Sequence, residues 1–527
     1  MLDRISTLNE ILNTDEVNSQ TEIFNEVFIS ALDICAPFTT KIVRRPYAPW
    51  ITEELREKIR EKNDMLKILK LNRLDETLNN EFKQKKRHTS FLTHKAKANH
   101  NKVKIMNSKS DKERWNIINQ CVPRKGKSKL QFDNPKTKAD EFNHFFANVG
   151  RNTYEKTQNM ISDVTVQRNE TTKIYGGKRP FRPQPVTVET VIITIKSLNN
   201  SNAYGADGIP TRFLKESLFV IAFYITFIIN TSIVTGKFPS VWKHPLVNPL
   251  HKKGNTDDPN NYRPVSILPV LSKVIEKIVS RQLMDHLEKE KLLSNTQQGF
   301  RRGLSTETAL LMVTDEIYKN IEERKISLLM LCDLSKAFDS VNHLILLEKC
   351  KEHHIDTFWF EDYLKDRYQS VRLHDVKSNT ERVDFGVPQG SVLGPILFLI
   401  YINDMARHIK DCSIVQYADD TQILLEGDVD NIEELTQRAA DVLDLAKTYF
   451  QKNGLLLNAK KTQCIFIGAR QYISRIHDNI TINFNCNEIR PQNKVKNLGI
   501  IFDNYMTFEH HIDALHRKVM GTLIYLN

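Results

Sequence analysis

The sequence predicts an α+β fold, in which helices are mixed with short antiparallel strands. Three patterns indicate it. Apolar residues recur at helical spacing over 271–283 and again over 310–321. The apolar run at 326–331 is typical of a buried strand. Two apolar arms within 412–425 flank Tyr417-Ala418-Asp419-Asp420, which predicts a β-hairpin with acidic residues at its tip.

The first 180 residues are predicted to form a mostly helical extension. Thr52 can cap a helix, because its hydroxyl can accept a backbone N–H bond, and Glu53 and Glu54 then lie in the favourable first turn. Residues 176–185 contain two glycines and three prolines, which is typical of a linker. We therefore expect a boundary near residue 180, followed by a more densely apolar domain.

A chain of 527 residues can hold about three domains of ordinary size or one large core with extensions, and the composition is that of a globular protein. Of the 527 residues, 40% are hydrophobic and 26% are charged. The apolar run from Leu218 to Ile229 is 12 residues long. A membrane span needs roughly 20 residues, so we expect a buried core helix and no membrane partner. The 7 cysteines show no C-x-x-C spacing, which argues against a zinc or redox motif and fits a reducing compartment.

Positive charge is concentrated in one segment. The net charge is +11, and residues 51–130 contain 22 Lys and Arg against 10 Asp and Glu, which leaves the rest of the chain close to neutral. A basic segment on a neutral body is typical of polyanion binding, although a basic helix can equally be a solvated face. We expect nucleic-acid contacts from two clusters, the second of them in a predicted loop: Lys83, Lys85, Lys86 and Arg87, and Arg124, Lys125, Lys127 and Lys129.

Carboxylates occur where two apolar segments end. Asp333 follows the predicted strand, and Asp419 and Asp420 lie at the tip of the predicted hairpin. Buried carboxylates need a counter-charge, and oxygen ligands of this kind suit Mg²⁺. Two such ions held close together activate an attacking oxygen and stabilise a leaving one in phosphoryl transfer. Each feature alone has an ordinary explanation, because Asp-Asp pairs are common in turns and a single Asp can cap a helix.

Seven motifs, in order along the chain, resemble those of one enzyme family. Tyr417-Ala418-Asp419-Asp420 matches its Y-x-D-D hairpin, and 334–343 (LSKAFDSVNH) matches the segment after its first catalytic aspartate. The other matching segments are 261–266 (NYRPVS), 298–301 (QGFR), 386–395 (GVPQGSVLGP) with 401–404 (YIND), 457–462 (LNAKKT) and 497–499 (NLG). From about Tyr204 to Asp503 the chain resembles the reverse transcriptase of non-LTR retrotransposons, close to the jockey type.

The resemblance implies a right-hand polymerase. The fingers and an antiparallel palm sheet would occupy 181–503, with a core at about 236–503, between the basic helical extension at 1–180 and the start of a thumb at 504–527. Asp333 and Asp419 would ligate both of two Mg²⁺ ions, which Mn²⁺ could replace, with Asp420 nearby and less direct. The ions would lower the pKa of the primer 3′-hydroxyl and neutralise the triphosphate.

The resemblance also assigns a nucleotide site. Arg263 and Lys252 would grip the triphosphate, although Lys253 could take the place of Lys252. Phe338 would clash with a ribose 2′-hydroxyl and so favour DNA synthesis; the other explanation is a core Phe. Lys461 would protonate the leaving pyrophosphate, unless it is a solvated surface lysine. The assigned nucleotide-binding residues are Lys252, Arg263, Phe338, Gln389, Gly390 and Lys461.

The resemblance also gives roles to Gln389, Gly390 and one turn late in the chain. Gln389 would line the nucleotide pocket, and Gly390 would let the backbone approach closely because it has no side chain. The segment from Lys496 to Gly499 resembles the turn that supports the primer end, and an ordinary strand turn is the alternative.

The sequence departs from the family pattern in places. Tyr204 replaces a proline in the early P-G-x-D-G motif, and Phe450 stands where a tryptophan is usual, but neither belongs to the predicted metal site. Family members usually carry an endonuclease ahead of a basic connector and a longer thumb. Here the chain begins just before the connector and stops at Asn527, so we expect a fragment of an element, or a decayed or shortened copy.

The sequence thus predicts an RNA-directed DNA polymerase of a mobile element that uses an RNA template, a DNA primer or target, and dNTPs. The family primes on a nicked chromosomal end, which implies a nuclear site of action with a cytoplasmic phase. Two alternatives stay open: a non-catalytic nucleic-acid-binding remnant, and an RNA-dependent RNA polymerase, which Phe338 disfavours. The template, the insertion site and the oligomeric state are not indicated by the sequence.

Overall fold

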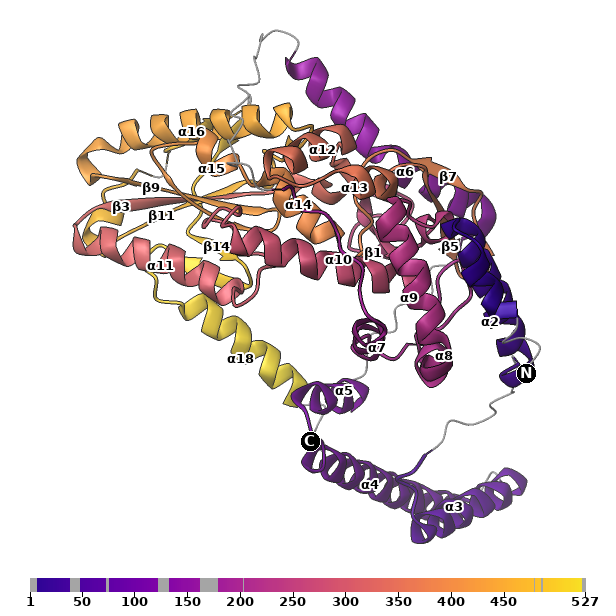
Figure 1. The fold of residues 1–527 in the computed structure, drawn as a ribbon. Helices are drawn as coiled ribbons and strands as arrows, with labels where there is room; N and C mark the ends of the chain where they lie inside the picture. The colour runs from indigo at the N-terminus through magenta and orange to yellow at the C-terminus, as the bar shows by residue number, and fades with distance from the viewer. Residues whose placement is uncertain are drawn as a thin grey trace. The chain divides into compact units, whose positions relative to one another are not determined.

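The computed structural model describes residues 7–37, 48–72, 75–121, 132–161, 179–201, 203–477, 479–484 and 487–523 (Figure 1). The chain divides into two compact units. Unit 1 comprises residues 1–37 and 131–508, and unit 2 comprises 38–130 and 509–527. These units do not follow the expected boundary at 180, because parts of the predicted extension pack within unit 1.

The central sheet of unit 1 has four antiparallel strands in the order β11-β3-β9-β8. They are β3 (Ile326–Cys332), β8 (Ser413–Tyr417), β9 (Asp420–Gly427) and β11 (Gln463–Ile467). Figure 1 shows α16 (Ile432–Lys452) on one side of this sheet and α11 (Thr306–Glu322) on the other. Alternate residues of β3 enter the two cores, since Leu328 and Met330 pack on the α16 side and Leu329 on the α11 side. A strand buried on both faces reads as a continuous apolar run, as predicted.

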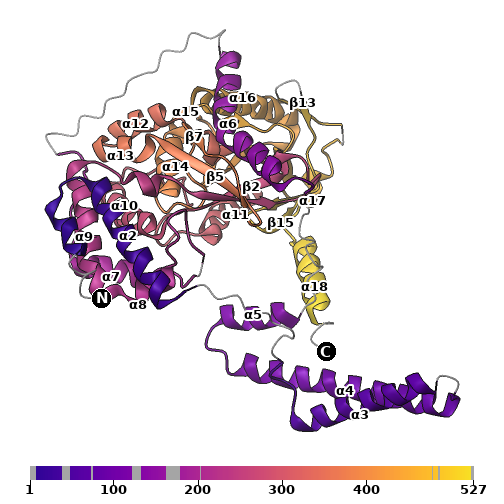
Figure 2. The same cartoon turned by 90° about the vertical axis from the view of Figure 1, so that its right-hand side faces the viewer.

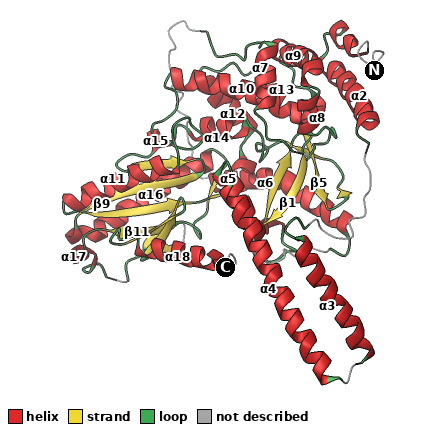
Figure 3. Cartoon of the chain, turned by 90° about the horizontal axis from the view of Figure 1, so that it is seen from below, coloured by secondary structure: helices red, strands yellow, loops and turns green. Residues whose placement is uncertain are grey.

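A second sheet lies apart from the first, as the two groups of yellow strands in Figure 3 show. Its path is β2-β1-β5-β6, and β7 also pairs with β5. The hairpin of β1 (Leu246–His251) and β2 (Tyr262–Ile267) presents the predicted triphosphate-binding residues. The other strands are β5 (Arg367–Leu373), β6 (Val376–Lys377) and β7 (Glu381–Val383). The mixture of helices and antiparallel strands confirms the predicted α+β class.

The helices α9 (Leu218–Thr235) and α10 (Val270–Lys289) supply much of the remaining core. In the described part of the chain, α9 alone is long and apolar enough to cross a membrane. One face of it is buried in the protein core, including Ile225 and Ile229. Phe219, by contrast, is 85% exposed on the outer face. The predicted core helix is therefore present, and it is buried on one face only.

Two helices of the predicted N-terminal extension pack on the body of unit 1. Figure 2 shows α2 (Val17–Cys35) beside α9, and Asn9 accepts a hydrogen bond from the Tyr224 hydroxyl at 2.7 Å. The helix α6 (Pro135–Ile161) contacts β5, and Asn143 on α6 donates to the Asn379 carbonyl at 2.8 Å. An apolar helix face predicts that another surface covers it, and for α2 and α6 that surface is the body of unit 1.

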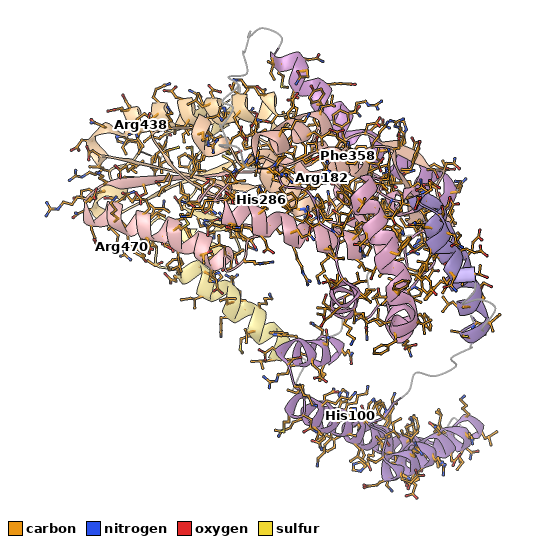
Figure 4. The ribbon with its side chains drawn as sticks, viewed as in Figure 1. His100, Arg182, His286, Phe358, Arg438 and Arg470 are labelled. Atoms are coloured by element: carbon orange, nitrogen blue, oxygen red, sulfur yellow. The ribbon has the colours of Figure 1, made fainter. Side chains whose placement is uncertain are left out.

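The described part of the predicted linker is fastened to unit 1. The backbone of Phe181 donates to His354 O at 2.8 Å and accepts from Asp356 N at 2.8 Å. The Arg182 guanidinium pairs with the Asp356 carboxylate at 2.8 Å and lies over the Phe358 ring (Figure 4). Residues 176–178 lie outside the described residues.

Unit 2 contains a helical hairpin of α3 (Glu53–Leu71) and α4 (Glu76–Met106), with α5 (Asp111–Cys121) and α18 (Glu509–Leu523). The Thr52 hydroxyl accepts from Leu55 N at 3.3 Å, so the predicted cap is present. The first basic cluster lies exposed on α4, and Lys85 pairs with Glu61 at 3.5 Å. The second cluster, Arg124, Lys125, Lys127 and Lys129, lies outside the described residues.

Smaller elements complete the described fold. The helices are α7 (Val188–Lys196), α8 (Thr211–Glu216), α12 (His343–Glu352), α13 (Phe358–Leu364), α14 (Gly394–Ile402), α15 (Met405–His408) and α17 (Arg470–Ile473). The 3₁₀ turns are η1 (Asn9–Asn13), η2 (Ser240–Lys243), η3 (Pro259–Asn261), η4 (Ala337–Ser340) and η5 (Val429–Asn431). The strand pairs are β4 (Leu334–Ser335) with β10 (Leu456–Leu457), β12 (Ile482–Phe484) with β13 (Asn487–Ile489), and β14 (Lys494–Asn497) with β15 (Ile500–Asp503). Phe450, which replaces the usual tryptophan, is fully buried in the core.

The packing of α6 on η4 predicts that Gly150→Ala destabilises the protein. A Cβ at Gly150 would lie 2.2 Å from the Asp339 carbonyl oxygen, and that backbone cannot move freely. Helix propensity alone would favour alanine by about 1 kcal/mol. We expect overpacking to outweigh it and to cost roughly 1–3 kcal/mol in urea unfolding followed by circular dichroism.

The control is Gly521→Ala, the same change in a helix where no atom lies within 4 Å of the added Cβ. It should leave stability unchanged or raise it. A Gly150→Ala protein as stable as the wild type would show that α6 does not press on η4.

Candidate active site

Strand register brings the three predicted carboxylates to one end of the central sheet. β3 and β9 are paired up to Cys332 and Thr421, so Asp333 and Asp420 are the neighbouring residues at that end. Tyr417 pairs with Asp420, which leaves Ala418 and Asp419 as a two-residue turn. Residues separated by more than eighty positions in the sequence therefore converge.

The carboxylates of Asp333, Asp419 and Asp420 repel one another because they carry like charges and lie close together. The pKa of Asp420 is raised to about 6 by partial burial and by the carboxylates of Asp419 and Asp333. Burial and the charge of Asp333 also raise the pKa of Asp419, while Arg263 opposes the shift. Asp333 is paired with Lys461, whose Nζ lies 3.0 Å from Asp333 Oδ2. The ammonium group of Lys461 thus supplies part of the missing positive charge.

The donor set fits a divalent cation that keeps an open coordination shell. Within the described residues, no three His, Cys, Asp or Glu side chains are gathered closely enough to hold a metal ion by themselves. Mg²⁺ is usually bound by one or two carboxylates and completes its shell with water and substrate phosphates. Hard oxygen donors that repel one another at the rim of a cleft match that requirement. Asp333 and Asp419 are the residues that would hold the ion, with Asp420 beside them.

A cleft of about 920 Å³ opens beside the carboxylates. Strand β2 of the second sheet contributes to its wall, together with the β8–β9 turn and the segments after β3 and around Pro388. Every residue that the resemblance assigned to the nucleotide site lines it. The lining includes Lys252, Arg263, Phe300, Asp333, Lys336, Phe338, Asp339, Gln389, Gly390, Asp419, Asn458 and Lys461. Lys253 is absent from the lining, which favours Lys252 over its neighbour.

The cleft concentrates positive charge. The pKa of Lys252 is lowered by burial and by the nearby charges of Arg263 and Lys461. Burial likewise lowers the pKa of Lys336, with Lys252 and Lys461 adding to the effect and Asp339 opposing it. A bound metal–phosphate group can relieve both kinds of repulsion, because the phosphate offsets the cations and the metal ion offsets the carboxylates.

Phe338 contacts both the protein core and the cleft, the two environments expected for it from the sequence. Its ring stacks on Phe398 of α14 at a centroid distance of 4.5 Å and an interplanar angle of 24°. It is half-buried against the core and also lines the cleft. The ring is thus supported from behind and presents its other side to the cleft.

Gln389 and Gly390 are tied to the backbone of β2 and to Asp339. The Gln389 amide donates to Asp339 Oδ1 at 2.8 Å, and the Gln389 carbonyl accepts from Ser266 N at 2.8 Å. Burial raises the pKa of Asp339 to about 6, and the bond from Gln389 opposes that shift. Gly390 has φ +131, and a Cβ there would lie 2.5 Å from the Ser266 carbonyl oxygen. The close approach at Gly390 is therefore to β2.

The turn that resembles a primer-end support lies beside Asp420. Lys496, Asn497 and Leu498 line a small pocket of about 150 Å³ together with Asp333 and Asp420. Asn497 Nδ2 donates to Gln422 Oε1 on β9 at 2.6 Å. The β14–β15 hairpin is thereby attached to the strand that carries Asp420.

Sequence reasoning did not select several residues that the cleft contains. Lys336, Asp339 and Phe300 lie inside quoted motifs, but nothing in their type or spacing separated them from their neighbours. Phe300 has φ +56 and is 48% exposed, an unusual state for a bulky residue. Only the folded chain shows that these three side chains share a cleft with Asp333.

Comparisons with known proteins agree with the motifs. Residues 250–502 match the family model described as reverse transcriptase (RNA-dependent DNA polymerase). The chain is 28% identical over 347 residues to the probable RNA-directed DNA polymerase from transposon BS of Drosophila melanogaster, an alignment that covers 64% of this chain and 38% of that protein.

Two further relatives from Drosophila melanogaster show the same extent of similarity. Identity is 29% over 342 residues with the RNA-directed DNA polymerase from mobile element jockey, covering 63% of this chain and 37% of the relative. Identity is 27% over 380 residues with the probable RNA-directed DNA polymerase from transposon X-element, and the alignment covers 68% of this chain and 39% of that relative. The chain spans less than two fifths of the length of these relatives.

Charge repulsion at the site predicts that Asp420→Asn stabilises the metal-free protein. A folded-state pKa near 6, above the usual value for Asp, means that ionisation costs stability as pH rises from about 4 to 6, and the full cost persists above 6. We therefore expect a higher Tm for Asp420→Asn at pH 7.5 in EDTA, and a difference that disappears as pH falls towards 4.

Asp428→Asn, an exposed position just after the far end of β9, is the matched control and should not change Tm. A Tm for Asp420→Asn that is unchanged or lower at pH 7.5 would contradict the repulsion.

Proposed function

We propose, on the premise that residues 250–502 form a reverse transcriptase domain of the type found in non-LTR retrotransposons, that this chain is an RNA-directed DNA polymerase. It extends a primer 3′-hydroxyl with dNTPs on an RNA template. The observation that carries the proposal is that Asp333 and Asp419 line one cleft together with a cluster of cations, and that strand register places Asp420 beside them. A polymerase needs both, because its substrate is a metal-bound triphosphate.

The carboxylates would hold the catalytic ions. Reverse transcriptases generally use divalent metal ions, and Asp333 and Asp419 would bind two Mg²⁺, with Asp420 beside them. The ions supply activation of the 3′-hydroxyl and neutralisation of the charge that develops on the phosphates. Lys461 would exchange Asp333, its partner at 3.0 Å, for a phosphate oxygen and donate a proton to the leaving pyrophosphate.

The other cleft residues orient the nucleotide. Arg263 offers a planar fork for two phosphate oxygens, and Lys252 offers a point charge. Gln389, held by Asp339, fixes the wall of the pocket near the sugar. Phe338, backed by Phe398, is too rigid to yield to a ribose 2′-hydroxyl, so deoxynucleotides are preferred.

The helical hairpin of unit 2 binds template RNA or target DNA through phosphates. Its support is charge, since α4 carries the exposed cluster Lys83, Lys85, Lys86 and Arg87. Contacts of this kind are insensitive to sequence and sensitive to salt. The proposal includes nuclear action, because priming on a chromosomal end takes place there.

The proposed activity is tested by primer extension on poly(rA)/oligo(dT) with Mg²⁺. We expect dTTP incorporation by the wild type, a strong preference for dTTP over UTP, and a loss of at least about 10³-fold in Asp419→Asn, since a metal-bridging charge is removed. Preference for UTP would indicate an RNA polymerase. Nucleic-acid binding without any incorporation would indicate a non-catalytic remnant.

The proposed role of the hairpin predicts a change in the salt dependence of binding. Replacing Lys83, Lys86 and Arg87 together by alanine should weaken RNA binding and reduce the slope of log K against log salt by up to about 2, at about 0.7 for each lost single-strand phosphate contact. Fluorescence anisotropy with a labelled RNA at several salt concentrations measures both quantities.

The control replaces three exposed cations of unit 1, Lys289, Lys351 and Lys365, by alanine and so changes net charge equally. If both triple variants lower the slope by the same amount, the effect is one of net charge and the hairpin has no specific role.

A further inference from the structure

The turn that carries Asp419 has an unfavourable backbone. Ala418 adopts φ +58, a left-handed conformation that residues with a Cβ disfavour. The turn is two residues long, and the next residues on either side are the last pair of β8 and β9. An alanine in this conformation, next to a carboxylate that is repelled by Asp333, needs support from outside the hairpin.

A loop supplies that support along the free edge of the sheet. β8 is the edge strand, and the loop before α11 runs beside it. Gln416 N donates to Thr296 O at 2.8 Å, and Gln298 N donates to Gln416 O at 2.8 Å. The loop therefore behaves as a short fifth strand as far as Gln416.

The side chain of Gln297 continues this ladder where the backbone stops. Gln297 Oε1 accepts from Ala418 N at 3.0 Å and from Gly299 N at 2.9 Å, and its Nε2 donates to Ala418 O at 3.4 Å. Gln297 is 1% exposed. A buried carboxamide is the neutral side chain group that can satisfy an N–H and a C=O of one residue together.

Close packing fixes the loop against the turn. A Cβ at Gly299 would lie 2.4 Å from Ala418 N, so a larger residue would push the loop away from the hairpin. On its other side the loop is anchored by Arg301, whose Nε and Nη2 each lie 2.8 Å from an oxygen of Glu288 on α10. The loop that contains Gln297 is thus tied to α10.

We propose that Gln297 is a positioning residue for the proposed polymerase reaction, which holds the Ala418-Asp419 turn so that the Asp419 carboxylate stays beside Asp333. The inference rests on the proposed function for its catalytic consequence and on the hydrogen bonds alone for its structural part. Gln297 touches no reacting atom; it acts through the backbone of Ala418. Its loss should impair the chemical step more than nucleotide binding, because small misplacements of catalytic groups cost about 10²-fold.

The test compares Gln297→Met with Gln298→Met in the full chain. Gln298 lies in the same loop and is also buried, but its side chain bonds to Asn295 O and Thr308 Oγ1 and not to the hairpin. Hydrogen–deuterium exchange of the Ala418 amide gives a readout that needs no activity. We expect exchange at Ala418 to rise at least about tenfold in Gln297→Met, since its acceptor is gone, and to stay unchanged in Gln298→Met.

Single-turnover incorporation of dTTP on poly(rA)/oligo(dT) gives the second readout. Gln297→Met should lower the maximal rate by about 10- to 100-fold with an unchanged dTTP dissociation constant. Gln298→Met should leave both constants near the wild-type values. Gln297→Glu keeps an acceptor for Ala418 N but loses the donor to Ala418 O, so it should retain more amide protection at Ala418 than Gln297→Met.

The outcomes separate the two proposals. Unchanged exchange at Ala418 in Gln297→Met overturns the inference, whatever the activity. A rate loss that Gln298→Met shares, or one that comes with an equal rise in the dissociation constant, also overturns it, because a general loosening of the loop would then explain the data. Absence of incorporation by the wild type defeats the proposed function, while the exchange result still decides whether Gln297 holds the turn.

Discussion

Repulsion among Asp333, Asp419 and Asp420 is the constraint on which the rest of this structure depends. Strand register fixes the positions of these three residues, because the ends of β3 and β9 are adjacent and the turn between β8 and β9 is two residues long. Lys461 and Arg263 offset part of the negative charge. A divalent cation and phosphates bound in the cleft would relieve the remainder, which is why we propose that the site takes a charged substrate.

The fold maintains this arrangement by fastening each segment of the site from outside. The central sheet is buried on both faces, the hairpin edge is covered by the loop that contains Gln297, and η4 after Asp333 is pressed by α6 at Gly150. Rigid support of this kind is what an active site needs if like charges are to stay at bonding distance from shared ions. Stability lost at the carboxylates is thus offset by packing elsewhere.

Much of the fold could be predicted from local patterns in the sequence, whereas the candidate carboxylates are singled out by the family-like motifs around them. The apolar run of β3, the arms around Asp419 and the spacing in α11 fix the element types. The placement of α6 could not be predicted, since an apolar helix face does not say which surface will cover it. Gly150 is informative only once the Asp339 carbonyl is known to face it. The hydrogen bond between Gln297 and Ala418 joins residues 121 positions apart. Nothing in the sequence shows that Gln297, and not the adjacent Gln298, makes this contact.

The central claim is that Asp333 and Asp419 share divalent cations. Crystals of the protein with an RNA template, a dideoxy-terminated primer, the next dNTP and Mn²⁺ in place of Mg²⁺ would test it by anomalous diffraction. We expect Mn²⁺ peaks at roughly 2.0–2.3 Å from oxygens of both carboxylates and from the triphosphate, with Lys461 moved away from Asp333. A bound dNTP whose Mn²⁺ touches only one of the two carboxylates, or neither, would contradict the account.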